Sequence, residues 1–175
     1  MAIYIQKEPF DVSELTSNLI KGNTSIGAVV SFVGYVRDYN YTLTPKKLIQ
    51  MNLEHYPGMT EKALTKIELN AKLRWGLQSI CIVHRIGKLF PSDPIVAVIV
   101  ASEHRKKAFQ ACEYIIDFLK TDAPFWKKEI SSEDELWVQG RDEDYKRKSS
   151  WNLEGWLKNY HVDQLYLISL RLIAM

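Results

Sequence analysis

An apolar run at residues 95–102 leads directly into an amphipathic segment, and this junction limits the possible folds more than any other part of the chain. The run is nearly all Val, Ile and Ala, which predicts a central, buried strand. In the next segment, apolar residues recur at intervals of three and four, which predicts a helix from about Glu103 to Lys120. Pro124 ends the helix, because proline cannot continue one. The predicted buried stripe consists of Ala108, Ala111, Cys112, Ile115 and Leu119.

The helix and the segment that follows it are rich in cations. The cations are Arg105, Lys106, Lys107, Lys120, Lys127 and Lys128, with His104 beside them. Phe125 and Trp126 are expected to anchor the short segment that carries the last two lysines. Two interpretations stay open at this point: a solvated basic face, or cations aimed at one anionic ligand. A second face of the helix is expected to carry Lys106, Gln110, Glu113, Asp117 and Lys120, and the last three are expected to form a solvated row.

The rest of the chain predicts short strands and one further long helix. Strands are expected at residues 2–6, 26–36 (largely buried), 47–55, 80–84 and 135–140. Asp11 or Ser13 is expected to cap a short helix, and Thr60 a long one that ends at Trp75-Gly76. Ala63, Leu64, Ile67 and Leu73 are expected to face inward from the long helix. Strands with only two long helices predict an α+β class with a mixed or largely antiparallel sheet.

Composition excludes several classes of function. The chain has 175 residues and a net charge of +2, so it is sized for one domain and offers no general electrostatic argument for nucleic acid. The apolar runs are shorter than the roughly 18 residues of a membrane span. Cys81 and Cys112 have the surroundings of buried, unreactive thiols. The four histidines show no metal-binding spacing, so no metal site is expected. No secretory signal is visible, which favours the cytoplasm.

Three blocks in the same order resemble the large, catalytic subunit of molybdopterin synthase. They are GAVVSFVGYVRDYN at 27–40, LEHYPGMTEKAL at 53–64, and the long run from His84 to Glu129. The resemblance covers about residues 2–151. It implies an α/β-hammerhead core with a smaller β-rich subdomain. Residues 1–151 would form the synthase domain, and residues 152–175 an extension on which the resemblance is silent.

The resemblance also implies an assembly and a reaction. The family forms a homodimer at the centre of a heterotetramer, and each end binds a small ubiquitin-like sulfur-carrier subunit. The carrier's C-terminal Gly-Gly is a thiocarboxylate. Two sulfurs pass from it to the small-molecule substrate cyclic pyranopterin monophosphate, which forms the molybdopterin dithiolene. The resemblance implies no cofactor and no metal for this step.

Residue by residue, the resemblance implies two catalytic lysines, Lys120 and Lys127. The implied substrate-binding set comprises Tyr35, Val36, Arg37, His104, Arg105, Lys120, Lys127, Lys128 and Glu129. Relatives often have lysine where this chain has Tyr35, so a contact there would be made by the backbone. The sequence does not separate the roles of the two lysines: either could transfer a proton with a lowered pKa or stabilise an oxyanion as an ammonium.

Helix geometry adds one inference of its own. His104 and Lys120 are sixteen positions apart, which is roughly 24 Å at the α-helical rise. One small ligand can hardly touch both within one chain, so we expect a composite pocket with His104 and Arg105 supplied by the second protomer. Phe32, Met59 and Phe125 are candidates for a groove that holds the carrier tail. Competing readings are a non-catalytic phosphate- or nucleic-acid-binding module, and a catalytically silent relative.

Overall fold

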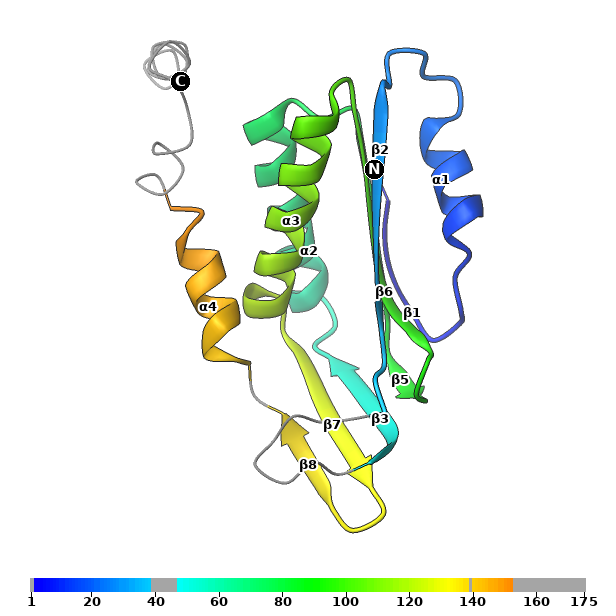
Figure 1. Ribbon diagram of the computed structural model, residues 1–175, viewed down its shortest axis with the longest axis vertical. Coiled ribbons are helices and arrows are strands. Elements are labelled where there is room, and N and C mark those ends of the chain that lie inside the picture. Colours follow the sequence, from blue (N-terminus) through cyan, green and yellow to red (C-terminus); the bar gives the residue numbers. More distant parts are fainter. Residues whose placement is uncertain (1, 39–46, 139, 153–175) are drawn as a thin grey trace.

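The computed structural model describes residues 2–38, 47–138 and 140–152, and Figure 1 shows its arrangement. The described residues form eight strands and four helices. In chain order these are β1 (Ala2–Gln6), α1 (Val12–Ile20), β2 (Ala28–Tyr35), β3 (Leu48–His55), α2 (Met59–Trp75), β4 (Ser79–Arg85), β5 (Gly87–Leu89), β6 (Pro94–Ser102), α3 (Arg105–Asp122), β7 (Phe125–Ser131), β8 (Glu135–Val138) and α4 (Asp142–Ser149).

The first sheet has the strand order β1-β4-β6-β2. Only the β1–β4 pair is parallel; β4 and β2 both pair with β6 in antiparallel register. Helices α2 and α3 cover one face and α1 covers the other (Figure 1). The stripe predicted for α3 lies in the main core, where Ala108, Ala111 and Ile115 are fully buried. The predictions of a central strand at β6 and of an α+β class are therefore confirmed.

The smaller second sheet is antiparallel, with the order β5-β3-β7-β8. Its inner face packs Met51, Leu53 and Leu89 against Val36 in a separate small core. The sequence did not predict β7, because its charged residues hide the alternation of a strand. It pairs with β3 from Phe125 opposite His55 to Ser131 opposite Leu48.

Some expectations about individual elements were wrong. The strand at 26–36 is not largely buried, because β2 lies at a sheet edge and none of its eight residues is fully buried. Thr60 does not cap α2. The residue before the first residue of α2 is Gly58, with φ of 81°, and Thr60 lies buried in the first turn.

Leu73 on α2 was expected to face inward, but it faces solvent, with 71% of its surface exposed, whereas Leu64 and Ile67 are buried as predicted. Of the two caps considered for α1, Asp11 is the one that accepts hydrogen bonds from the helix N-terminus.

Two expectations about the basic region were also wrong. Asp117 is not on a solvated row: it is only 5% exposed, and its carboxylate accepts a hydrogen bond of 2.7 Å from the Trp151 indole. Trp126 does not anchor its segment, since 62% of its surface is exposed, and Phe125 alone packs against the core.

No helix in the described part of the chain is long and apolar enough to cross a membrane. The expectation of an extension at 152–175 falls almost entirely on residues 153–175, which lie outside the described residues.

Candidate functional site

The turn between the end of α3 and the start of β7 is held in place by a hydrogen bond to α2. Ala123 follows the last residue of α3, and the chain enters β7 at Phe125. Thr60 Oγ1 donates a hydrogen bond of 3.2 Å to the Pro124 carbonyl and accepts one of 3.1 Å from the Tyr56 amide. Because Thr60 belongs to α2, this bond fixes the turn to a second helix. The turn lies between Lys120 and Lys127 and sets their relative position.

An aromatic stack with β4 also holds the start of β7. The ring of Phe125 lies on His84 of β4, with centroids 3.7 Å apart and planes inclined by 13°. Burial lowers the pKa of His84 to about 4, so the imidazole is neutral near pH 7. The neutral ring can donate from Nδ1 to the Arg85 carbonyl, 2.8 Å away. His84 therefore acts here as a buried platform for the strand that carries Lys127.

Lys127 lies among other cations. Its pKa is lowered from the ordinary value of 10.5, first by burial and then by the positive charges of Arg141, Arg37 and Lys120. Glu129, with Oε1 3.8 Å from the Lys127 ammonium nitrogen, opposes this effect. Side chains at alternate positions of a strand share a face, so Lys127 and Glu129 point the same way. The fold thus gathers cations from β7, α3 and the segments that follow β2 and β8.

Lys120 differs from Lys127 because it has a close acidic partner. Its ammonium nitrogen lies 3.1 Å from Asp144 Oδ1, on α4. Helix α4 packs beside α3 (Figure 1), where Lys148 also pairs with Asp122. The Lys120 side chain is 52% exposed and that of Asp144 only 16%. The ion pair with Asp144 therefore fixes the position of the Lys120 ammonium at the end of α3.

Arg141 and Asp144 were not identified from the sequence as site residues. The sequence does carry a signal for a helix at this place. Acidic residues fill the first turn of α4 and basic residues the last, the distribution that the helix dipole favours. A helix there could have been predicted from that pattern, but its position against Lys120 could not.

His104 and Arg105 lie at the opposite end of α3. The helix has 18 residues, so its ends are about 27 Å apart. The His104 side chain is 64% exposed and lies 3.8 Å from the Glu103 carboxylate. Within one chain the structure therefore brings together Arg37, Lys120 and Lys127, and leaves His104 and Arg105 away from them.

The remaining predicted positions have different surroundings. Val36 is buried, and its backbone N–H and C=O pair with Asp93 and Ser92, so it fixes the segment that carries Arg37. Tyr35 is 57% exposed. Lys128 points to the other face of the second sheet from Lys127, where it pairs with Glu135 and lies 5.8 Å from the centre of the Trp137 ring.

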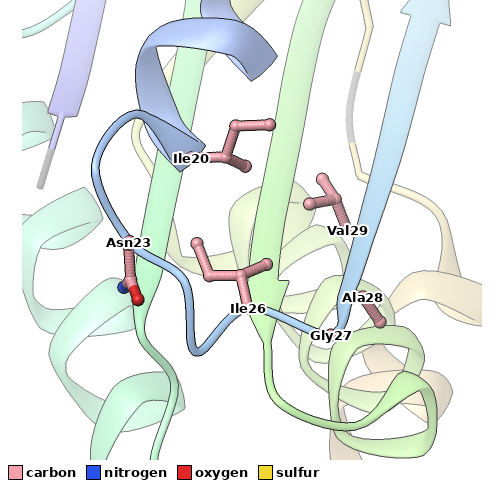
Figure 2. A pocket seen from close by; sticks show the side chains of 6 residues that line it. All are labelled: Ile20, Asn23, Ile26, Gly27, Ala28 and Val29. Atoms are coloured by element: carbon pink, nitrogen blue, oxygen red, sulfur yellow. The ribbon is translucent and has the colours of Figure 1, made fainter.

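Of the groove candidates, Met59 is 60% exposed, whereas Phe32 and Phe125 pack partly against the main core. A shallow hollow of about 250 Å³ lies elsewhere, between the end of α1 and the start of β2 (Figure 2). It is lined by Ile20, Asn23, Ile26, Gly27, Ala28 and Val29. No group of three or more His, Cys, Asp or Glu that could hold a metal ion occurs in the part of the chain that the structure describes.

Comparisons with known proteins give a consistent result. The family model described as "MoaE protein" matches residues 5–122. A molybdopterin synthase catalytic subunit of Pseudomonas aeruginosa is 51% identical over 151 residues, which is 86% of this chain and 99% of that protein. A molybdopterin biosynthesis MoaE protein of Burkholderia ambifaria has a similar structure, with a TM-score of 0.74, 46% identity, and coverage of 87% of this chain and 99% of that one. The crystal structure of molybdopterin synthase from Staphylococcus aureus matches with a TM-score of 0.71 and 37% identity, covering 78% and 96%.

Proposed function

Because this chain belongs to the MoaE protein family, we propose that it is the catalytic subunit of a molybdopterin synthase. In this role it is a sulfurtransferase: two sulfurs pass from the C-terminal thiocarboxylate of a small carrier subunit to cyclic pyranopterin monophosphate. Residues 1–151 are the synthase domain, and 152–175 are an extension. The protein acts in the cytoplasm, as a homodimer within a heterotetramer.

The single observation that carries the proposal is the cation cluster, found in a chain of this family. Lys127 is partly buried and its pKa responds to the charges of Arg37, Lys120 and Arg141. A cyclic phosphate needs such cations, and the planar guanidinium of Arg37 suits phosphate oxygens. The thiocarboxylate is also an anion, so both reactants are attracted to the same place.

The surroundings of the two lysines suggest separate roles. Lys127 has a lowered pKa, so a larger fraction of it is a neutral amine that can accept a proton. The Lys120 ammonium is held in position by Asp144, and this placement suits stabilisation of negative charge on the carrier's acyl oxygen as the carbon–sulfur bond breaks. Protons released as sulfur adds to the substrate pass to Lys127, and water replaces sulfur on the carrier to leave a carboxylate.

The other half of the pocket comes from the second protomer. His104 and Arg105 are too far from Lys120 in the same chain to contact one small substrate. The partner's His104 and the partner's Arg105 therefore complete the phosphate site. Tyr35 and Val36 border the site through the backbone beside Arg37, and Lys128 and Glu129 border it through β7.

The test is conversion of cyclic pyranopterin monophosphate to molybdopterin by this protein with a thiocarboxylated carrier. We expect product from the wild type, almost none from Lys120→Ala, and wild-type rates from Lys62→Ala, a matched change of an exposed lysine on α2. Far-ultraviolet circular dichroism checks that each variant is folded. A wild type that binds the carrier but forms no product would refute the proposal.

A further inference from the structure

Trp151, two positions after the last residue of α4, joins that helix to the main core. Its ring packs edge-on against Trp75 of α2 and Tyr114 of α3, with centroids 5.9 and 5.5 Å apart and planes inclined by 86° in both pairs. Its indole N–H donates a hydrogen bond of 2.7 Å to Oδ2 of Asp117, which is only 5% exposed. One side chain thus contacts both helices on this face of the first sheet, and it supplies a hydrogen bond to a buried carboxylate that is costly to leave unpaired.

Arg74 of α2 holds Trp151 from a second direction. Its Nη1 donates a hydrogen bond of 3.1 Å to the Trp151 carbonyl. Its guanidinium carbon lies 5.5 Å from the centre of the Trp151 ring, and 5.1 and 5.5 Å from the rings of Trp75 and Tyr114. A guanidinium at such distances is attracted to the faces of aromatic rings. Both the backbone and the ring of Trp151 are therefore held by the same cation.

Helix α4 depends on this anchor because none of its eight residues is buried. It lies beside α3, on the side away from the first sheet (Figure 1). Its ion pairs, Asp144 with Lys120 and Lys148 with Asp122, join partly exposed side chains, and such pairs contribute little to stability. A polar helix of this length is also marginal on its own. Among the contacts of the described residues, the packing of Trp151 is therefore the main attachment of this segment to the core.

The anchor is linked to α4 without a flexible joint. The Trp151 amide donates a hydrogen bond of 3.1 Å to the Lys148 carbonyl, so the backbone keeps its helical turn up to the anchor. Asp144, Lys148 and Trp151 are separated by four and three positions, the spacing of residues on one face of a helix. Their partners all lie on α3, and they are Lys120, Asp122 and Asp117. Fixing Trp151 consequently fixes Asp144, about two helical turns earlier.

We propose that Trp151 is a positioning residue of the site: seated between α2 and α3, it holds α4 so that Asp144 lies against Lys120 and Arg141 lies near Lys127. The docking of α4 is independent of any reaction, whereas its consequence for catalysis rests on the proposed function.

The two ends of this arrangement have separate effects on the site. Asp144 holds the Lys120 ammonium at 3.1 Å. Arg141 precedes the first residue of α4, and its charge lowers the pKa of Lys127 together with burial and the charges of Arg37 and Lys120, against the opposing carboxylate of Glu129. Release of α4 removes the positive charge of Arg141 from this place, so it should raise the pKa of Lys127.

Hydrogen exchange measures the docking of α4 directly. In the full chain, Trp151→Ala should make the backbone amides of α4 exchange about tenfold faster, while those of β4 and β6 keep their wild-type protection. Trp151→Phe keeps a ring and loses the N–H, so α4 should exchange at an intermediate rate. The matched control Phe109→Ala truncates an aromatic residue of α3 that is 63% exposed, and it should leave α4 unchanged. Wild-type exchange of α4 in Trp151→Ala would overturn the inference.

Titration of Lys127 separates positioning from a general loss of structure. The pKa is measured by NMR in protein with isotope-labelled lysine, with the Lys127 signal assigned from Lys127→Arg. Trp151→Ala should raise this pKa, whereas a variant that only unfolds more readily leaves the pKa of the folded protein unchanged. Added to Arg141→Ala, the same substitution should have a smaller effect, because the charge that it displaces is already absent. No rise, or an equal rise in both backgrounds, would overturn the inference.

Synthase activity separates the inference from the proposed function. With thiocarboxylated carrier and cyclic pyranopterin monophosphate, kcat should fall severalfold in Trp151→Ala, recover in part in Trp151→Phe, and keep its wild-type value in Phe109→Ala. Unchanged kcat in Trp151→Ala with α4 released would refute a positioning role. A wild type that forms no product would refute the proposed function instead, and the exchange and titration results would still decide whether Trp151 places α4 against the two lysines.

Discussion

Two inactive variants should restore each other's activity if the pocket is composite. His104→Ala removes a group at the start of α3, and Lys120→Ala removes one in its last turn. The helix spans about 27 Å, so one chain cannot supply both groups to one substrate. In a mixed dimer, one site receives the intact Lys120 from one protomer and the intact His104 from the other. The second site lacks both.

Free exchange of equal amounts makes about half of the dimers mixed, and each has one intact site of two, so activity should return to about one quarter of the wild-type value. Co-expression with two different affinity tags isolates the mixed dimer, which should reach about half. Molybdopterin formation is measured with saturating thiocarboxylated carrier. The control mixes His104→Ala with Arg105→Ala, which belong to the same end of α3 and should stay inactive. Absence of rescue in the first mixture, or rescue in the control, would refute the composite pocket.

Three further predictions concern titrating groups. Arg141→Ala should raise the pKa of Lys127 and move the acidic limb of kcat/KM to higher pH, whereas Glu129→Gln should move it lower; pH–rate profiles measure both. Folding lowers the pKa of His84 from 6.5 to about 4, so stability is fully present above pH 6.5 and is lost as pH falls, by on the order of 3 kcal/mol; urea unfolding of His84→Phe should lack this loss. Burial raises the pKa of Glu68 above 4.5, and neither carboxylate oxygen has a hydrogen-bond partner, so stability is lost as pH rises through the folded pKa. Glu68→Gln should therefore stabilise the protein by about 1–2 kcal/mol at pH 7, and an unchanged urea midpoint would contradict this.

The strand–helix junction could be predicted because its signal is local. In β6 and α3 the period of the apolar residues alone determines which side chains are buried, and Ala111 and Ile115 are buried as expected. The catalytic assignment of Lys120 and Lys127 stays a prediction from the resemblance, whereas their closeness in the structure follows from the proline turn between them.

Other features depend on contacts between distant parts of the chain. Asp117 has the spacing of an exposed residue, but it is buried and accepts a hydrogen bond from Trp151, 34 positions later. Strand β7 could not be predicted from its own residues, because what identifies it as a strand is its antiparallel pairing with β3. Leu73 shows the opposite case, because an apolar residue on α2 remains exposed where no other described element covers it. Local periodicity carries no information about such partners.

The ion pairs between α3 and α4 alternate in sign. Helix α3 contributes the cation Lys120 and the anion Asp122, and α4 contributes the anion Asp144 and the cation Lys148. Only one alignment of the two helices joins opposite charges in both pairs, because exchanging the partners would bring like charges together. Lys120 therefore helps to determine how α4 docks, in addition to the role proposed for it in the site. Asp144→Lys with Lys120→Asp would preserve both opposite-charge pairs while moving the ammonium from α3 to α4, which separates the docking of α4 from the chemistry proposed for Lys120.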